Sequence, residues 1–212
     1  NVILNFVSVD TASSNVVHLD WILHQSNPVK GNELVLNKRS GGASGWQTVA
    51  ALPAASGVFR DEVDFTIEPI NEYYLSMTNY CDEPRTTSIH NNMYLTATAD
   101  TISGSISFSW NHYFGWNHGV DHYELWRKAD SEPGLRYLET TSAFENSYSA
   151  DLAADAFHHT YVVRAVEEGG VSESWSNILS MDFKHSVTIP NIITPNGDEF
   201  NQYFHITKIE LY

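Results

Sequence analysis

The sequence contains an internal repeat, in which three strand-like segments of the first half recur in the second. In each segment apolar and aromatic residues alternate with polar ones, which is the period-two pattern of a strand with one buried face. A constant offset over separate strands predicts two copies of one folding unit. The matched residues are 89 positions apart in the pairs Trp21 and Trp110, Leu36 and Leu125, and Lys38 and Arg127, and 87 apart in Tyr74 and Tyr161.

The length of each copy predicts its fold class. The chain has 212 residues, and an immunoglobulin-like sandwich needs about 100. Short alternating strands separated by Gly, Asn, Asp and Pro leave no convincing helix, so we expect an all-β chain of two tandem sandwiches. The strand expected over 89–98 closes the first domain, and Ala99-Asp100-Thr101 is the expected joint. The predicted domains are 1–98 and 99–184, followed by a short C-terminal extension over 185–212.

The second copy resembles the fibronectin type III family. The matching residues are Trp110, Tyr123-Glu124-Leu125, Arg127, the run 161–166, Gly169-Gly170, Ser172, Ser176 and Asn177. In the first copy Trp21 and Tyr74 match, whereas Leu34 stands for the third-strand Tyr and Thr78 for an Ala. Both tryptophans are expected to fill the space between two sheets.

The charge balance argues against one class of partner. The chain carries 11 Lys plus Arg against 26 Asp plus Glu, a net charge of −15. Such a surface repels phosphate backbones, so nucleic acid is not an expected partner. No cofactor is expected, although clustered carboxylates could bind Ca²⁺. The single cysteine, Cys81, excludes an intrachain disulfide, and no run approaches the ~20 apolar residues of a transmembrane segment.

The composition changes after His185, where a turn-forming motif precedes an alternating run. The segment 189–212 resembles the opening of the gliding motility-associated C-terminal domain, the type B sorting domain of type IX secretion. Ile193, Glu199 and Gln202 depart from that family's pattern, and Gln202 is a poorer Ca²⁺ ligand than a carboxylate. The matching residues are Pro190, Asn191, Thr194, Pro195, Asn196, Gly197, Asp198 and Asn201.

This second resemblance implies a location and a partner. It implies a secreted or outer-membrane surface protein of a gliding bacterium, exported by secretion and sorting machinery that recognises the C-terminal region. The two sandwiches would then be non-catalytic spacers or adhesive modules that could bind a surface glycan or another surface protein. The alternative is an accessory spacer or carbohydrate-binding region of a secreted polysaccharide-degrading enzyme, whose catalytic domain would lie upstream.

The candidate interaction surface is aromatic. Trp126 is expected to face outward because Tyr123 and Leu125 face inward, and the other candidates, Tyr113, Trp116 and Trp175, lie on loops or near strand ends. Exposed rings can stack on sugars or anchor a protein partner. The favoured alternative is that these rings seal the contact between the domains or between domain and tail.

Catalytic and metal-binding patterns are weak. No nucleophile-elbow, zinc-protease or phosphate-loop motif occurs, so catalysis is not expected. The spacing of His118 and His122 would suit a metal on a helix, but the surrounding strand pattern argues against one. Glu62 and Asp64 share the outer face of an expected strand, where charged residues protect a sheet edge from aggregation.

Overall fold

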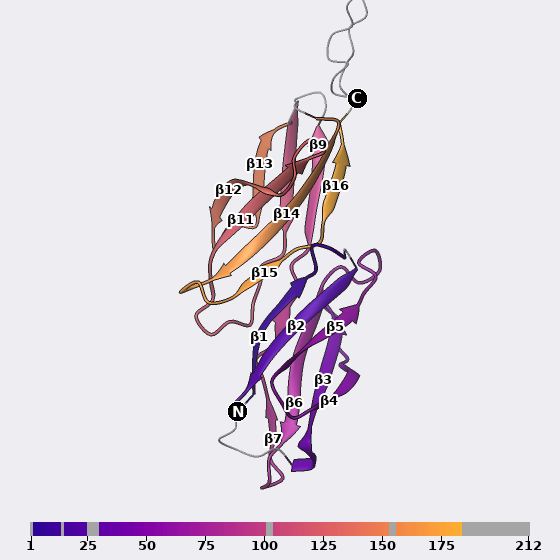
Figure 1. Ribbon diagram of the computed structural model, residues 1–212, viewed down its shortest axis with the longest axis vertical. Coiled ribbons are helices and arrows are strands. Elements are labelled where there is room, and N and C mark those ends of the chain that lie inside the picture. The colour runs from indigo at the N-terminus through magenta and orange to yellow at the C-terminus, as the bar shows by residue number, and fades with distance from the viewer. Residues whose placement is uncertain (1, 14, 25–29, 101–103, 153–155, 184–212) are drawn as a thin grey trace, which may run out of the picture.

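Antiparallel strands and their turns account for nearly all of the described chain. The computed structural model describes residues 2–13, 15–24, 30–100, 104–152 and 156–183. Within these ranges the only helical segment is a 3₁₀ turn at Lys30–Asn32. Figure 1 shows two groups of strands arranged along the long axis of the molecule, which is the tandem arrangement that the repeat predicts.

The first sandwich pairs a three-stranded sheet with a larger one. The strand order is β1-β2-β5 in one sheet and β4-β3-β6-β7 in the other, where β8 also pairs with β6. The first sheet comprises β1 (Val2–Val9), β2 (Val16–Leu23) and β5 (Gly57–Glu62). The second comprises β3 (Glu33–Ser40), β4 (Gln47–Pro53), β6 (Asn71–Thr78), β7 (Pro84–Thr86) and β8 (His90–Asn91).

The second sandwich repeats this plan. Its sheets have the orders β13-β10-β9 and β12-β11-β14-β15, and β16 pairs with β14 in the second sheet. The smaller sheet comprises β9 (Leu95–Asp100), β10 (Ser105–Trp110) and β13 (Ser147–Asp151). The larger comprises β11 (Val120–Ala129), β12 (Arg136–Ser142), β14 (His158–Glu167), β15 (Glu173–Trp175) and β16 (Leu179–Asp182). The expectation of an all-β chain with two tandem sandwiches of antiparallel sheets is confirmed.

Each sandwich has its own apolar core, with a tryptophan from the strand that the repeat identified. Trp21 belongs to a cluster with Leu36 and Tyr73 from the facing sheet. Trp110 belongs to the second cluster, where its ring lies 5.8 Å from that of Tyr123. Alternation on β2 and β10 directs these side chains inward, and both are buried.

The boundary between the sandwiches lies earlier than the sequence predicts. The strand expected over 89–98 divides in two: β8 pairs with β6 of the first sandwich, whereas β9 pairs with β10 of the second. Met93 and Leu95 accordingly belong to the second core. Ala99 and Asp100 are part of β9 and not of a joint, because Ala99 pairs with Ile106. Alternation within 89–98 does not reveal this change of sheet.

A bulge in β1 changes which side chains face the first core. The register to β2 shifts between Leu4 and Phe6, which leaves Asn5 as the extra residue. Before the bulge Leu4 points inward, and after it Val7 does. Phe6 packs instead against the core of the second sandwich. A bulge bends and twists its strand, and here it turns the free edge of β1 toward the other domain.

We expect Trp110→Ala to lower the free energy of unfolding by about 3–5 kcal/mol, the usual effect of removing a large core side chain. Urea denaturation followed by tyrosine and tryptophan fluorescence measures this loss. Phe144→Ala is the matched control, because the Phe144 ring is 92% exposed. Equal stability of Trp110→Ala and the wild-type protein would contradict the core assignment.

Candidate functional site

The loop between β10 and β11 inserts two aromatic side chains between the sandwiches. We call this contact between the two sandwiches the joint. The loop residues Tyr113 and Trp116 are buried, and their ring centroids lie 4.1 Å apart. The Val7 backbone N–H donates to Tyr113 Oη at 3.0 Å, and Trp116 Nε1 donates to the Asn5 carbonyl at 2.7 Å. Both bonds therefore connect the second sandwich to the main chain of β1, at and just after its bulge.

Two of the four aromatic residues that the sequence suggests as an interaction surface are buried at the joint. Tyr113 is 4% exposed and Trp116 is 8% exposed, so neither offers a ring face to a partner. The loop reaches across to β1, whose partly buried Phe6 packs against the core cluster that contains both rings. Their position corresponds to the alternative hypothesis, in which the rings cover the contact between the domains. Trp126 and Trp175 remain partly exposed.

Strand β15 makes the second set of bonds to β1. Ser174 Oγ donates to the Val7 carbonyl at 2.7 Å, and the Trp175 backbone N–H donates to Ser8 Oγ at 2.9 Å. Ser174 is fully buried. Figure 1 shows β15 crossing beside the end of β1. The free edge of β1 is thus bonded by two separate segments of the second sandwich.

His90 is the titratable group buried in this joint. Its Nδ1 lies 2.8 Å from Tyr113 Oη, and its Nε2 lies 3.1 Å from Ser88 Oγ. The Tyr113 hydroxyl and the neutral His90 ring both have a partner for their polar hydrogen if Tyr113 Oη–H donates to Nδ1 and Nε2–H donates to Ser88 Oγ. Burial lowers the pKa of His90 to about 4, because a charged ring loses hydration there. Burial also raises the pKa of Tyr113.

Gly115 makes room for the His90 ring. Its backbone has φ of +126°, and a Cβ built at this position would lie 2.2 Å from Cγ of His90. Any other residue would therefore collide with the ring and also occupy an unfavourable backbone region. The loop can cross the joint here because the residue lacks a side chain.

Two asparagine side chains bond main-chain groups near the joint, Asn91 across it and Asn177 within the second sandwich. Asn91 accepts from the Phe114 N–H at 2.8 Å and donates to the His112 carbonyl at 2.9 Å. Asn177 bonds both the N–H and the carbonyl of Leu95. An amide can donate and accept at once, which suits it to a crossing point between sheets. Sequence reasoning missed His90 and Asn91, although the run 90–92 contains three adjacent polar residues within an otherwise alternating strand.

The outer face of the second sandwich carries a ladder of stacked side chains across four strands, which we call the aromatic ladder. Arg164 Cζ lies 5.3 Å from the Trp126 ring centroid and 5.1 Å from that of Trp175. Tyr137 stacks edge-on against Trp126 at 5.9 Å. These cation–π and aromatic contacts join β12, β11, β14 and β15.

Two carboxylates hold the polar atoms of the aromatic ladder. Glu124 accepts from Trp126 Nε1 at 2.9 Å and from Arg164 Nη2 at 2.6 Å. Glu173 accepts from Trp175 Nε1 at 2.9 Å and from Arg164 Nη1 at 2.7 Å. Burial alone would raise the pKa of Glu124, but hydrogen bonds from Arg164 and neighbouring side chains lower it. The sequence identifies both tryptophans but not the arginine between them.

The other candidate residues do not gather into a site. His122 bonds to Asp121 and Glu124, and His158 bonds to Asp182. Within the described ranges, no group of three or more His, Cys, Asp or Glu side chains could hold a metal ion. Glu62 and Asp64 are exposed at the end of β5, an edge strand. The part of the chain that the structure describes has no helix with the length and apolar character of a membrane span.

The sorting motif, from Pro190 to Asn201, lies outside the described residues.

Two of the solved structures to which this chain is similar are a pectate lyase and a three-domain fragment of CNTN1. A pectate lyase, PelI from Erwinia chrysanthemi, in complex with tetragalacturonic acid, is 16% identical with a TM-score of 0.35, and the match covers 42% of this chain and 28% of that one. The FN1–FN3 domains of chicken CNTN1 are 15% identical with a TM-score of 0.36, and the match covers 87% of this chain and 65% of that one. This chain therefore spans less than two thirds of either structure.

Comparison of the sequence with protein families and with curated proteins finds no match.

We expect His90 to make the folded protein sensitive to acid. The folded-state pKa of about 4 lies below the ordinary value of 6.5. Between these values the unfolded chain binds a proton that the folded protein does not, so stability falls as pH falls through this window. The full loss is about 3 kcal/mol at 1.36 kcal/mol per pKa unit.

Urea denaturation of the wild-type protein and of His90→Gln at about pH 7 and about pH 4 isolates this contribution. The glutamine can hydrogen-bond but does not titrate in this range. The wild-type protein should lose more stability than the variant on acidification. An equal loss in both proteins would contradict a buried, neutral His90.

Proposed function

We propose that this chain is a non-catalytic, rigid two-sandwich module of a modular protein, which acts as a spacer or adhesive segment. The joint is the observation that carries this proposal. In it, the second sandwich bonds main-chain atoms of β1 through Tyr113, Trp116 and Ser174. Val7, Tyr113, Trp116 and Ser174 are buried, so bending between the domains would expose them and break these hydrogen bonds, each of which contributes about 0.5–1.5 kcal/mol.

Rigidity matters for a spacer because it fixes the distance between the segments at its two ends. A flexible linker leaves that distance variable, whereas a joint closed by buried contacts sets it. The short connection from Asn91 to Leu95 passes directly from one sheet into the other. This connection is therefore too short to act as a flexible linker between the two sandwiches.

We also propose that the parent protein is secreted or displayed at an outer-membrane surface and is recognised there by secretion and sorting machinery. The support is the resemblance of residues 189–212 to the type B sorting domain. The net charge of −15 fits an exposed module that must remain separate from its neighbours. The gliding-bacterium origin rests on the same resemblance.

A second candidate function is glycan binding, as an accessory region of a secreted polysaccharide-degrading enzyme. The aromatic ladder supports it, because Trp126 and Trp175 are partly exposed and Tyr137 is 47% exposed. Rings on an outer sheet face can stack on sugars. The ladder is also self-contained, however, because its indole N–H groups and its guanidinium are already bonded to Glu124 and Glu173. We therefore prefer the architectural function.

We expect Trp116→Ala to loosen the joint while both sandwiches stay folded. The substitution removes the bond to Asn5 and the ring packed on Tyr113. Small-angle X-ray scattering should show a broader distribution of interatomic distances than that of the wild-type protein. Trp46→Ala is the matched control, because Trp46 packs on Tyr74 and Arg39 inside the first sandwich.

The wild-type profile is itself a test of the architectural function. A rigid pair of sandwiches gives scattering that one conformation can fit. A wild-type profile that requires an ensemble of interdomain angles would contradict the proposal, whatever the variant does.

We expect residues 190–201 to be necessary for surface delivery. The complete C-terminal region of the parent protein, beginning at His185, would be fused to a secreted reporter in a gliding host, with and without this segment. The intact fusion should reach the cell surface, and the deletion should remain in the periplasm. Delivery of both fusions to the same place would contradict the sorting role without affecting the spacer role.

A further inference from the structure

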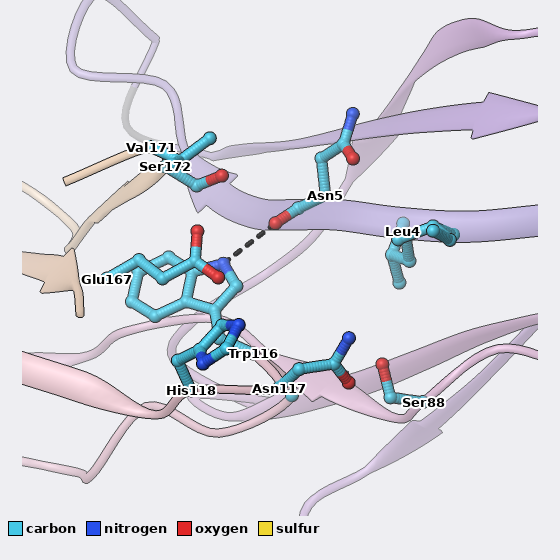
Figure 2. Close-up of a pocket in the computed structure, with 11 residues that line it drawn as sticks. Leu4, Asn5, Ser88, Trp116, Asn117, His118, Glu167, Val171 and Ser172 are labelled. Carbon is cyan, nitrogen blue, oxygen red and sulfur yellow. Dashed lines mark hydrogen bonds between the residues drawn. The ribbon is translucent and has the colours of Figure 1, made fainter. Parts of the chain in front are cut away.

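A cleft of about 240 Å³ opens where the two sandwiches meet. Three segments and the single residue Ser88 line it: the segments are β1 near its bulge, the loop from Gly115 to His118, and the turn from Glu167 to Ser172. Figure 2 shows side chains from these segments around one opening, with the Trp116 bond to Asn5 at its side. The two copies must be joined for this cleft to exist, because neither sandwich alone supplies all three segments.

The walls of the cleft are tied to one another by main-chain hydrogen bonds. The Glu168 N–H donates to the Gly119 carbonyl at 3.1 Å, which joins the loop to the turn. Within the turn, the Glu167 N–H donates to the Ser172 carbonyl at 3.0 Å. Trp116 anchors the loop to β1. The cleft is therefore formed before any ligand arrives, as most small-molecule sites are.

Four of the polar side chains in the cleft are free to bond a ligand. The side chains of Asn117, His118, Glu167 and Ser172 make no hydrogen bond or ion pair within the part of the chain that the structure describes. Together they offer an amide, an imidazole, a carboxylate and a hydroxyl. They supply both donors and acceptors, whereas a site for a simple cation would need acceptors alone.

The charge and the apolar lining of the cleft narrow the ligand class. No lysine or arginine lines it, and the carboxylate of Glu167 repels anions. After burial itself, that carboxylate is the second cause of the raised pKa of Tyr113, so its charge acts on the buried joint. Ile3 and Val171 supply an apolar part. A fitting ligand is neutral, has several hydroxyl groups and carries an apolar C–H face.

We propose that this cleft binds one neutral sugar unit of a glycan. A sugar hydroxyl both donates and accepts, which matches the mixed groups of the cleft, and two neighbouring hydroxyls can bond one carboxylate. The volume lies below the ~300–1,000 Å³ of sites for drug-sized ligands, which fits a single ring. This inference goes beyond the architectural function, which requires no ligand.

The test is an NMR titration of the whole chain with the methyl glycosides of glucose, galactose, mannose and N-acetylglucosamine, and with galacturonate. At about 50 mM sugar, a site with a Kd of about 1 mM is nearly saturated. At least one neutral glycoside should shift the amide signals of Asn117, Glu167 and Ser172. Galacturonate should bind at least about tenfold more weakly, because its charge repels that of Glu167.

Two matched variants locate the site. Glu167→Ala should raise the Kd of the bound glycoside about tenfold, since charge-assisted hydrogen bonds are lost. Glu168→Ala removes the neighbouring carboxylate, which does not line the cleft, and should leave the Kd unchanged. Well-dispersed spectra of both variants confirm that they are folded, and Trp126→Ala should also bind normally.

Three outcomes would overturn the proposal. The first is that no neutral glycoside shifts the cleft signals at about 50 mM. The second is an equal Kd for Glu167→Ala and the wild-type protein, or galacturonate binding as tightly as a neutral sugar. The third is loss of binding in Trp126→Ala but not in Glu167→Ala, which would assign binding to the aromatic ladder. None of these outcomes bears on the rigidity that scattering measures.

Discussion

An edge strand has main-chain groups that its own sheet cannot pair, and the arrangement of this molecule follows from how those of β1 are bonded. Exposed edges favour association with other chains, and proteins usually cover or charge them. Here the second sandwich covers the edge with the hydroxyls of Tyr113 and Ser174 and the indole of Trp116. The bulge at Asn5 turns the edge toward these groups. One local irregularity therefore both protects the first sheet and positions the second domain.

The same contacts connect the buried joint to the outer surface of the second sandwich. Strand β15 bonds β1 on one side and carries Trp175 of the aromatic ladder on the other. Arg164 links this short strand to β14 and, through Glu124, to β11. Stacked side chains thus hold β15 where its Ser174 can bond β1. The ladder has a structural purpose whether or not it also binds a sugar.

The fold could be predicted from the sequence because strand alternation and the repeat are local signals. Trp21, Trp110 and Tyr123 point inward as period-two reasoning requires. The domain boundary could not be predicted in the same way, because β8 and β9 share one alternating run and differ only in the sheet that they join. The joint depends on pairings between residues more than 100 positions apart, such as Val7 with Tyr113, and no local pattern encodes these. His90, Gly115 and the cleft are visible only once those pairings exist.

The bonds at the centre of the joint end on peptide groups of β1. The Asn5 and Val7 carbonyls and the Val7 N–H are present whatever side chains those positions carry. Apart from Ser8 and Phe6, whose side chains contact the second sandwich, β1 can therefore accept substitutions without breaking the junction, provided that the bulge persists. The other demands on sequence fall on the tyrosine, tryptophan, serine and glycine of the second sandwich and on His90 and Asn91 of the first. A domain of this second type could dock onto a preceding sandwich whose first strand bulges at the same place and whose strand β8 carries the same His and Asn, which would allow such modules to be combined in series.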